Sequence, residues 1–355
     1  MAGTENRIFY LDTIRVIAIL CVVLLHVTGH LAEITDYNIY TIFSPSGYFE
    51  TFMNNFTRIG VDLFLMLSGA LLLSREFTLK EFYTRRLFRV VKPFLFWSLI
   101  FSVIIFLACY FIADFTYIAS FGVYDFFSVF IDTLLLQAPA SAVYWFIWIM
   151  IYVYLAMPFL NRWIKGTHQV NIEYFLIIWL IFIAVINPLN NYYLKILSNF
   201  ISPIALAVLG YYLEFNDRRL FKNRLFSWIL IILPSVLMFV YSYLVVDSQI
   251  LFVFHRYSIP VIFIAVGVYT LVKSGKSMNN PHQLIKKSVL SIAVCSYGIY
   301  LIHSQLIFVF RKVLNISFPF TVEYILLFTV GFIVSWFIIY ILSKIPVIGD
   351  YVGVK

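Results

Sequence analysis

Apolar runs of about 20 residues recur along the whole chain and are separated by short charged connectors. A helix needs about 20 mostly apolar residues to cross the hydrocarbon core of a bilayer, whereas each strand of a membrane barrel shows only about 10 alternating residues. Of the 355 residues, 63% are hydrophobic and 12% are charged, which is too few polar side chains to coat a soluble globule. The sequence therefore predicts an all-α, polytopic transmembrane helical bundle.

Ten runs are long enough to cross a membrane. They lie near residues 11–31, 58–74, 90–113, 143–161, 172–189, 199–213, 226–245, 251–272, 288–310 and 321–343. The two longest polar stretches, about 32–57 and 274–288, are predicted to be loops, and 124–137 is predicted to be an interfacial or re-entrant helix outside the ten. No linker divides the chain, so residues 1–355 are expected to form a single integral-membrane domain.

Basic loops alternate with loops that are poor in lysine and arginine once these spans are drawn. Most of the 25 basic residues fall in one set of loops, with six of them between residues 75 and 92. Basic loops mark the cytoplasmic side of a multi-pass protein. Both termini are therefore expected in the cytoplasm, and the protein in the inner (plasma) membrane of the cell, surrounded by lipid. The concentration of lysine and arginine in the cytoplasmic loops explains the net charge of +8, so no nucleic-acid partner is predicted.

The first apolar run, YLDTIRVIAILCVVLLHVTGH, contains four ionisable side chains. Asp12 and Arg15 are three residues apart and His26 and His30 are four apart, so each pair shares a helix face. At 100° per residue, the spacing from Arg15 to His26 returns to within roughly 20° of the same face, about 16 Å further along the axis. Ionisable groups at membrane depth normally face a bundle interior or a cavity. We therefore predict one polar stripe along this helix.

The residue types in this stripe suit acid–base and anion chemistry. His26 exchanges a proton near neutral pH and suits a general base that activates a hydroxyl. The permanently charged Arg15 suits recognition of phosphate or carboxylate, which predicts an anionic donor on the cytoplasmic side and an external nucleophile. Two alternatives stay open. Asp12 with Arg15 is also typical of an ion pair that closes a helix end, and either histidine is also typical of a packing residue.

Five motifs, in order along the chain, resemble those of the membrane-bound acyltransferase family 3. Each motif alone is weak, whereas five in order over most of a ten-span chain are specific. The chain is most similar to the small single-module members of the enterobacterial common antigen O-acetyltransferase type. The motifs are Arg15-x10-His26 after YLDTIR; GVDLFLMLSG, Gly60–Gly69; the R-x-x-R of Arg86 and Arg89; YWFIWIMIYVYLAMPFL, Tyr144–Leu160; and SYGIYLIHSQLI, Ser296–Ile307.

The resemblance implies an enzyme that transfers an acyl group, usually acetyl, from cytoplasmic acyl-CoA to a hydroxyl of a surface polysaccharide or a lipid-linked sugar. The catalytic residues of the family correspond to His26 and Arg15. The basic pair that would meet the CoA phosphates, together with Arg15, corresponds to Arg86 and Arg89, although orientation alone also places arginines there. No permanently bound cofactor is expected, because acyl-CoA is a substrate.

Supporting roles are expected for Asp12, Asp62, Ser68 and His303. Asp62, at the outer end of the second span, either orients a histidine or caps its helix and faces water. His303, near the middle of the ninth span, is expected to have a polar role in the core. Gly69 is expected to pack closely against another helix. The candidate donors to an oxyanion, each of which also suits packing, are Ser68, Tyr144, Trp145 and Tyr297.

Two other classes of protein remain as alternatives. A polysaccharide exporter or proton-coupled transporter would also use ten spans with an intramembrane polar stripe, but it needs no cytoplasmic R-x-x-R motif and often shows internal repeats. A metal enzyme built on His26, His30 and a carboxylate is disfavoured because no HExxH-like signature is present, so no metal is predicted. The acceptor sugar, the acyl chain and the oligomeric state cannot be predicted from the sequence.

Overall fold

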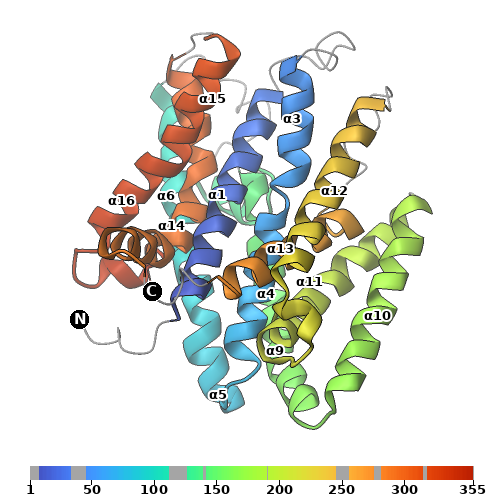
Figure 1. Cartoon of the computed structure of the whole chain (residues 1–355). Helices are drawn as coiled ribbons and strands as arrows, with labels where there is room; N and C mark the ends of the chain where they lie inside the picture. The colour runs from blue at the N-terminus through green and yellow to red at the C-terminus, as the bar shows by residue number, and fades with distance from the viewer. Residues whose placement is uncertain are drawn as a thin grey trace. The chain divides into compact units, whose positions relative to one another are not determined.

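The computed structural model describes residues 8–32, 45–111, 126–138, 141–189, 191–244, 256–275, 281–314 and 318–354. All regular structure within these ranges is helical (Figure 1). Nine of the described helices are long and apolar enough to cross a membrane, and they are Phe9–Gly29, Gly47–Leu72, Leu79–Leu107, Ser141–Lys165, Gln169–Leu189, Tyr192–Phe215, Arg224–Tyr241, Gln283–Arg311 and Phe320–Leu342. The predicted polytopic helical bundle is therefore confirmed. The predicted span at 251–272 corresponds to a shorter apolar helix, α13 (Ile259–Lys273).

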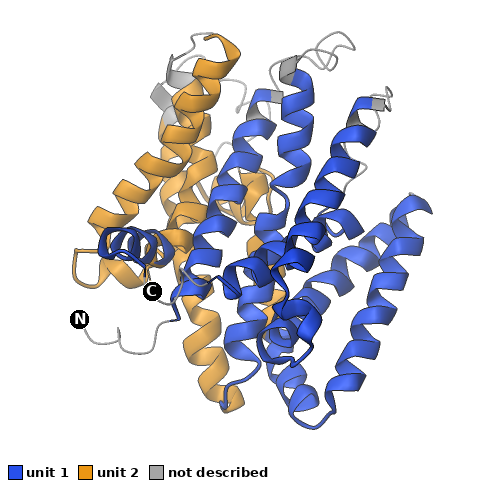
Figure 2. Cartoon of the chain, viewed as in Figure 1, with its two compact units in different colours: residues 1–77, 155–293 blue, residues 78–154, 294–355 orange. Residues whose placement is uncertain are grey.

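The chain divides into two compact units, residues 1–77 with 155–293 and residues 78–154 with 294–355 (Figure 2). We refer to them as unit 1 and unit 2. The long helices α9 (Trp145–Lys165) and α14 (Gln283–Leu314) each contribute residues to both units. The expectation of a single integral-membrane domain stays a prediction, as does the cytoplasmic position of both termini.

The centre of unit 1 is α4 (Ile59–Leu72), which contacts α1 (Phe9–Ala32), α11 (Tyr192–Phe215) and α13. Further out, α12 (Arg224–Leu244) packs on α13, and α10 (Gln169–Ile186) packs on α11. Small residues bring α4 and α11 into backbone contact, because a Cβ on Gly69 would lie 1.7 Å from the Ala207 carbonyl oxygen, and one on Gly210 would lie 1.9 Å from the Met66 carbonyl oxygen. The predicted close packing of Gly69 is therefore confirmed.

The second membrane span is longer than predicted and is broken in the middle. The predicted loop at 32–57 is wrong for residues 45–56, which form α3 (Pro45–Phe56). A short turn at Thr57 and Arg58 leads from α3 into α4, and the two helices together form the candidate span Gly47–Leu72. The stretch looks like a loop in sequence because it is polar, but Glu50 and Asn55 are buried in the fold. The predicted loop at 274–288 is likewise wrong for residues 283–288, which belong to α14.

Unit 2 is built around α6 (Phe88–Phe111) and the C-terminal part of α14. The Tyr297 hydroxyl on α14 donates to the Val90 carbonyl on α6 at 2.7 Å. A short helix, α8 (Phe126–Leu134), packs on α6 through a 3.2 Å hydrogen bond from Ser102 to Thr133, and it matches the extra helix predicted at 124–137. The unit ends with α15 (Phe320–Phe328), a π-helical turn η8 (Thr329–Val334) and α16 (Ser335–Leu342).

The outer helices carry large apolar side chains on their exposed faces. Over an 18-residue stretch of each candidate span, 28% of the residues are buried in that of α10 and 17% in that of α12. In the candidate span that contains α4, 78% of such a stretch is buried. Exposed leucine, isoleucine and phenylalanine side chains on whole helix faces are stable next to lipid and unstable in water. The fold is therefore that of a multi-pass membrane protein.

Candidate active site

The first helix of unit 1 carries the predicted polar stripe. Because its 24 residues form one continuous helix, α1, the expected relation between Arg15 and His26 holds in the fold. Arg15 Nη1 lies 3.1 Å from Asp12 Oδ1, as the i,i+3 spacing predicts. The Asp12 side chain is buried, whereas that of Arg15 is 24% exposed. The guanidinium is therefore both oriented by a carboxylate and open to contact with a further anion. His30 also lies in α1, but its side chain is outside the described residues.

His26 is held in one tautomer by its own helix. The His26 Nδ1 atom lies 2.9 Å from the Val22 carbonyl oxygen. A carbonyl oxygen can only accept a hydrogen bond, so Nδ1 must be the protonated nitrogen. In the neutral ring the lone pair is then on Nε2, which is the nitrogen that can take a proton. The side chain is half-buried.

The beginning of α1 is tied to two other helices of unit 1 through one carboxylate. Glu214, near the end of α11, accepts hydrogen bonds from the Tyr10 hydroxyl and, at 2.9 Å, from the Tyr269 hydroxyl on α13. Lys273 Nζ lies 3.4 Å from the same carboxylate and donates to the Leu213 carbonyl oxygen at 3.0 Å. We refer to these residues as the Glu214 clamp. It holds the helix that carries Arg15 and His26 against α11 and α13.

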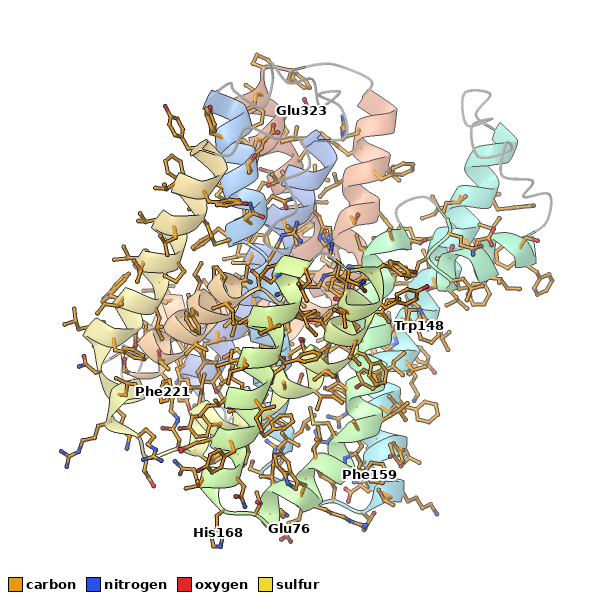
Figure 3. The ribbon with its side chains drawn as sticks, turned by 90° about the vertical axis from the view of Figure 1, so that its right-hand side faces the viewer. Glu76, Trp148, Phe159, His168, Phe221 and Glu323 are labelled. Atoms are coloured by element: carbon orange, nitrogen blue, oxygen red, sulfur yellow. The ribbon has the colours of Figure 1, made fainter. Side chains whose placement is uncertain are left out.

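Basic and acidic side chains gather in the connecting segments at one end of unit 1. Glu76 and His168 lie together at that end (Figure 3). Lys165 Nζ is 3.5 Å from a Glu76 carboxylate oxygen. After α11, Arg218 forms a two-pronged ion pair with Glu173, with distances of 2.8 and 2.6 Å, and hydrogen bonding to that carboxylate raises the pKa of Arg218. These are loops that the sequence predicts to be basic and cytoplasmic.

Asp62 neither faces water nor caps its helix. It lies in the first turn of α4, inside a candidate span, and its side chain is fully buried, so the prediction that it faces water is wrong. Neither carboxylate oxygen has a hydrogen-bond partner among the described residues, so Asp62 does not orient His26 through a direct hydrogen bond. Nor does it cap α4, because the N-cap position is Arg58.

Three of the four candidate oxyanion donors use their hydroxyl hydrogen within the fold. Ser68 donates to the Phe64 carbonyl oxygen at 2.9 Å, one turn back in α4. In unit 2, Tyr144 donates to the Leu301 carbonyl oxygen at 3.1 Å, and Tyr297 donates to the backbone of α6. A donor whose hydrogen already bonds a backbone carbonyl is poorly placed to stabilise an oxyanion. These contacts favour packing roles for the three hydroxyls.

The remaining predicted site residues belong to unit 2. Arg86 lies in a π-helical turn, η1 (Phe82–Leu87), and Arg89 follows at the beginning of α6. Arg86 is half-buried and Arg89 is exposed. Single π-helical turns are rare and occur often at functional sites. His303 on α14 is fully buried, and its Nδ1 lies 2.8 Å from the Tyr300 carbonyl oxygen, which selects the same tautomer as in His26.

Within the described ranges, no group of three histidine, cysteine or acidic side chains is arranged to hold a metal ion.

The fold and helix α1 define a multi-pass membrane protein with an arginine–histidine stripe on its first span. The chain belongs to acyltransferase family 3, because the family model for the acyltransferase domain matches residues 8–342, nearly the whole sequence. No curated protein and no solved structure was found to match it. The protein is therefore an acyltransferase of the membrane, and the likeness to the enterobacterial common antigen O-acetyltransferase type stays a prediction.

Proposed function

We propose that this protein transfers an acyl group, most simply acetyl, from acyl-CoA to a hydroxyl of a cell-surface polysaccharide or a lipid-linked sugar. The observation that carries the proposal is the placement of a tautomer-fixed His26 about 16 Å along one helix from the ion-paired Arg15. The distance suits a donor whose charged end and reactive end are far apart. Acyl-CoA has this form, with phosphates at one end and a thioester at the end of a long pantetheine arm.

The chemistry assigns one step to each residue. Arg15 contacts a phosphate of the donor from the cytoplasmic side. In unit 2, Arg86 and Arg89 keep the phosphate-binding role that the family resemblance implies for them. His26 Nε2 takes the proton of the acceptor hydroxyl as its oxygen attacks the thioester carbonyl. The carbon–sulfur bond then breaks, the ester forms, and the CoA thiolate recovers the proton from the imidazolium. The protein keeps no part of the acyl group in this scheme.

Membership of an acyltransferase family favours transfer over polysaccharide export or proton-coupled transport. The proposal includes the location and orientation predicted from the sequence, the inner (plasma) membrane with both termini in the cytoplasm. In that orientation the basic connecting segments of unit 1 face the compartment that contains acyl-CoA.

The test is transfer of label from radiolabelled acetyl-CoA into envelope carbohydrate by membranes that contain the wild type or a variant at matched expression. His26→Ala is expected to lower transfer at least a hundredfold, since general-base catalysis alone contributes roughly 10²–10⁴-fold. Arg15→Ala is also expected to lower transfer, because a charge-assisted contact with the donor phosphate is lost. His168→Ala and Arg218→Ala are matched controls in exposed segments of the same unit and should retain transfer. Wild-type label equal to that of membranes without the protein would refute the proposal.

A further inference from the structure

A group of buried polar side chains surrounds the break between α3 and α4. Five residues form this group, which we call the Asp62 cluster: Asn55, Arg58, Asp62, Tyr257 and Ser258. The first three come from the end of α3 and the beginning of α4, and the last two directly precede α13. Four of the five are at least nine-tenths buried, and Asp62 is fully buried. The break lies within the candidate span Gly47–Leu72, where irregular backbone is tolerated only against protein or a polar cavity.

Two segments far apart in sequence contribute to the cluster, and they are connected in the fold. The helices α4 and α13 are in contact. Asp62 and Tyr257 interact electrostatically, and the Arg256 guanidinium acts on Asp62, Tyr257 and Arg58. Arg58 also donates to the Asn54 side-chain oxygen at 2.7 Å, which joins the turn to the last part of α3. In Figure 1, α4 continues along the axis of α3 past this turn.

Six buried atoms of the cluster have no hydrogen-bond partner among the described residues. Three of them accept a hydrogen bond when Asp62 is ionised, which the Arg256 guanidinium favours: both Asp62 carboxylate oxygens and Asn55 Oδ1. The Tyr257 and Ser258 hydroxyls can donate or accept, and only Arg58 Nε must donate. Buried polar atoms of folded proteins are almost always paired, and Ser258 does not use its hydroxyl to cap α13. Because acceptors outnumber donors, a ligand in this cluster must mainly donate hydrogen bonds.

This requirement selects one class of ligand. An anion has no hydrogens to donate, so it would leave the Asp62 and Asn55 oxygens unpaired. A cation would donate, but Arg58 and Arg256 oppose a further positive charge. A neutral sugar donates through several hydroxyls and also accepts at each of them. Two neighbouring hydroxyls can donate one hydrogen to each Asp62 oxygen, and the Tyr257 ring adds an apolar surface of the kind on which a sugar ring packs.

The helix that carries Asp62 also contacts the helix that carries the proposed base. A Cβ on Gly60 would approach the Ala18 carbonyl oxygen to 2.7 Å and the Val22 side chain to 3.0 Å, so the beginning of α4 rests on this part of α1. The Val22 carbonyl oxygen is the group bonded by His26. The beginning of α4 therefore meets α1 about one turn from His26.

We propose that the Asp62 cluster is the acceptor subsite and binds a neutral sugar through a pair of vicinal hydroxyls that donate to the Asp62 carboxylate. This inference rests on the proposed function, because it assigns the sugar whose hydroxyl meets His26. Asp62, Tyr257 and Ser258 are then binding residues for the acceptor, and they take no proton in the transfer step.

The experiment measures acceptor binding and transfer separately, with the purified full-length protein. The probe is tritium-labelled envelope carbohydrate from cells that produce the protein, freed of ester-linked acyl groups with mild alkali so that its hydroxyls can accept. It is used intact or after periodate oxidation and borohydride reduction. Periodate cleaves the carbon–carbon bond between neighbouring hydroxyls and so removes vicinal diols. Variants are Asp62→Asn and Tyr257→Phe, and the matched controls are the exposed Asp217→Asn and Tyr174→Phe.

We expect intact carbohydrate to bind the wild type without acyl-CoA, and periodate-treated carbohydrate to bind at least tenfold more weakly. Asp62→Asn should raise the half-saturating carbohydrate concentration at least tenfold in binding and in transfer, because one charge-assisted hydrogen bond is lost. Half-saturation by acetyl-CoA should not change. Tyr257→Phe should show a smaller effect of the same kind, and the two control variants should match the wild type.

The inference is overturned if wild-type transfer is robust while Asp62→Asn leaves carbohydrate half-saturation unchanged. In that case the substitution is expected only to change thermal stability, as it would for a buried carboxylate without a ligand. Equal binding of intact and periodate-treated carbohydrate would also overturn it. Binding that depends on Asp62, without any transfer of label, would instead refute the proposed function and still support the sugar-binding site.

Discussion

Replacing Gly69 with alanine tests the packing at the centre of unit 1. The added Cβ would lie 1.7 Å from the Ala207 carbonyl oxygen, and an ordinary contact begins at 3.4 Å, so α4 and α11 must separate by about 1.7 Å. Both sides of the clash are backbone, which cannot rotate away. We therefore expect the upper end of the usual cost of overpacking, about 3 kcal/mol.

The matched control for this substitution is Gly29→Ala in α1, where an added Cβ has no neighbour within 4 Å. Alanine favours a helix over glycine by about 1 kcal/mol at most in each variant, so the difference between the two variants isolates the clash. Three kcal/mol corresponds to roughly 6–12 °C in the unfolding midpoint of a domain of this size. The assay is recovery of the monodisperse, detergent-solubilised protein after heating. Equal midpoints for Gly69→Ala and Gly29→Ala would refute the backbone contact.

Three further substitutions test contacts within unit 1 by the same assay or by proteolysis. Glu214→Gln removes the charged acceptor of the Glu214 clamp, so we expect a loss of about 2–4 kcal/mol; an unchanged midpoint would mean that the clamp does not hold α1. Asn161 donates to the carbonyl oxygens of Leu73 and Arg75 at 2.7 and 3.0 Å, so Asn161→Asp should speed tryptic cleavage after Arg75 severalfold, unless that turn is held by other contacts. Arg218→Ala should leave the unfolding midpoint close to that of the wild type, because the ion pair is exposed; a clear drop in the midpoint would show that the pair is shielded from solvent.

The helices of this fold could be predicted largely from hydropathy, because lipid imposes long apolar runs on any segment that crosses it. The break in the second span could not be predicted in this way. Asn54, Asn55 and Arg58 make the stretch before α4 polar, which is typical of a loop. Neighbouring helices bury this stretch instead, and α12 covers α3 with aromatic contacts such as Phe52 against Phe239 at 5.9 Å.

Part of the candidate site could likewise be predicted from the sequence, and part of it could not. The alignment of Asp12, Arg15 and His26 follows from helical periodicity, which is a local property that a sequence contains. The Glu214 clamp joins residues 10, 214 and 269, and no local pattern brings these positions together. Asp62 is similar, since its burial depends on contacts with α1, α11 and α13 that only the folded chain provides.

The most direct test of the central claim is transfer across a membrane by purified protein in liposomes. Radiolabelled acetyl-CoA is added outside, and envelope carbohydrate is enclosed inside. The account predicts that label enters the enclosed carbohydrate with the wild type and with His168→Ala, and falls at least a hundredfold with His26→Ala. Label that enters equally well with His26→Ala, or that does not enter with the wild type, would contradict it.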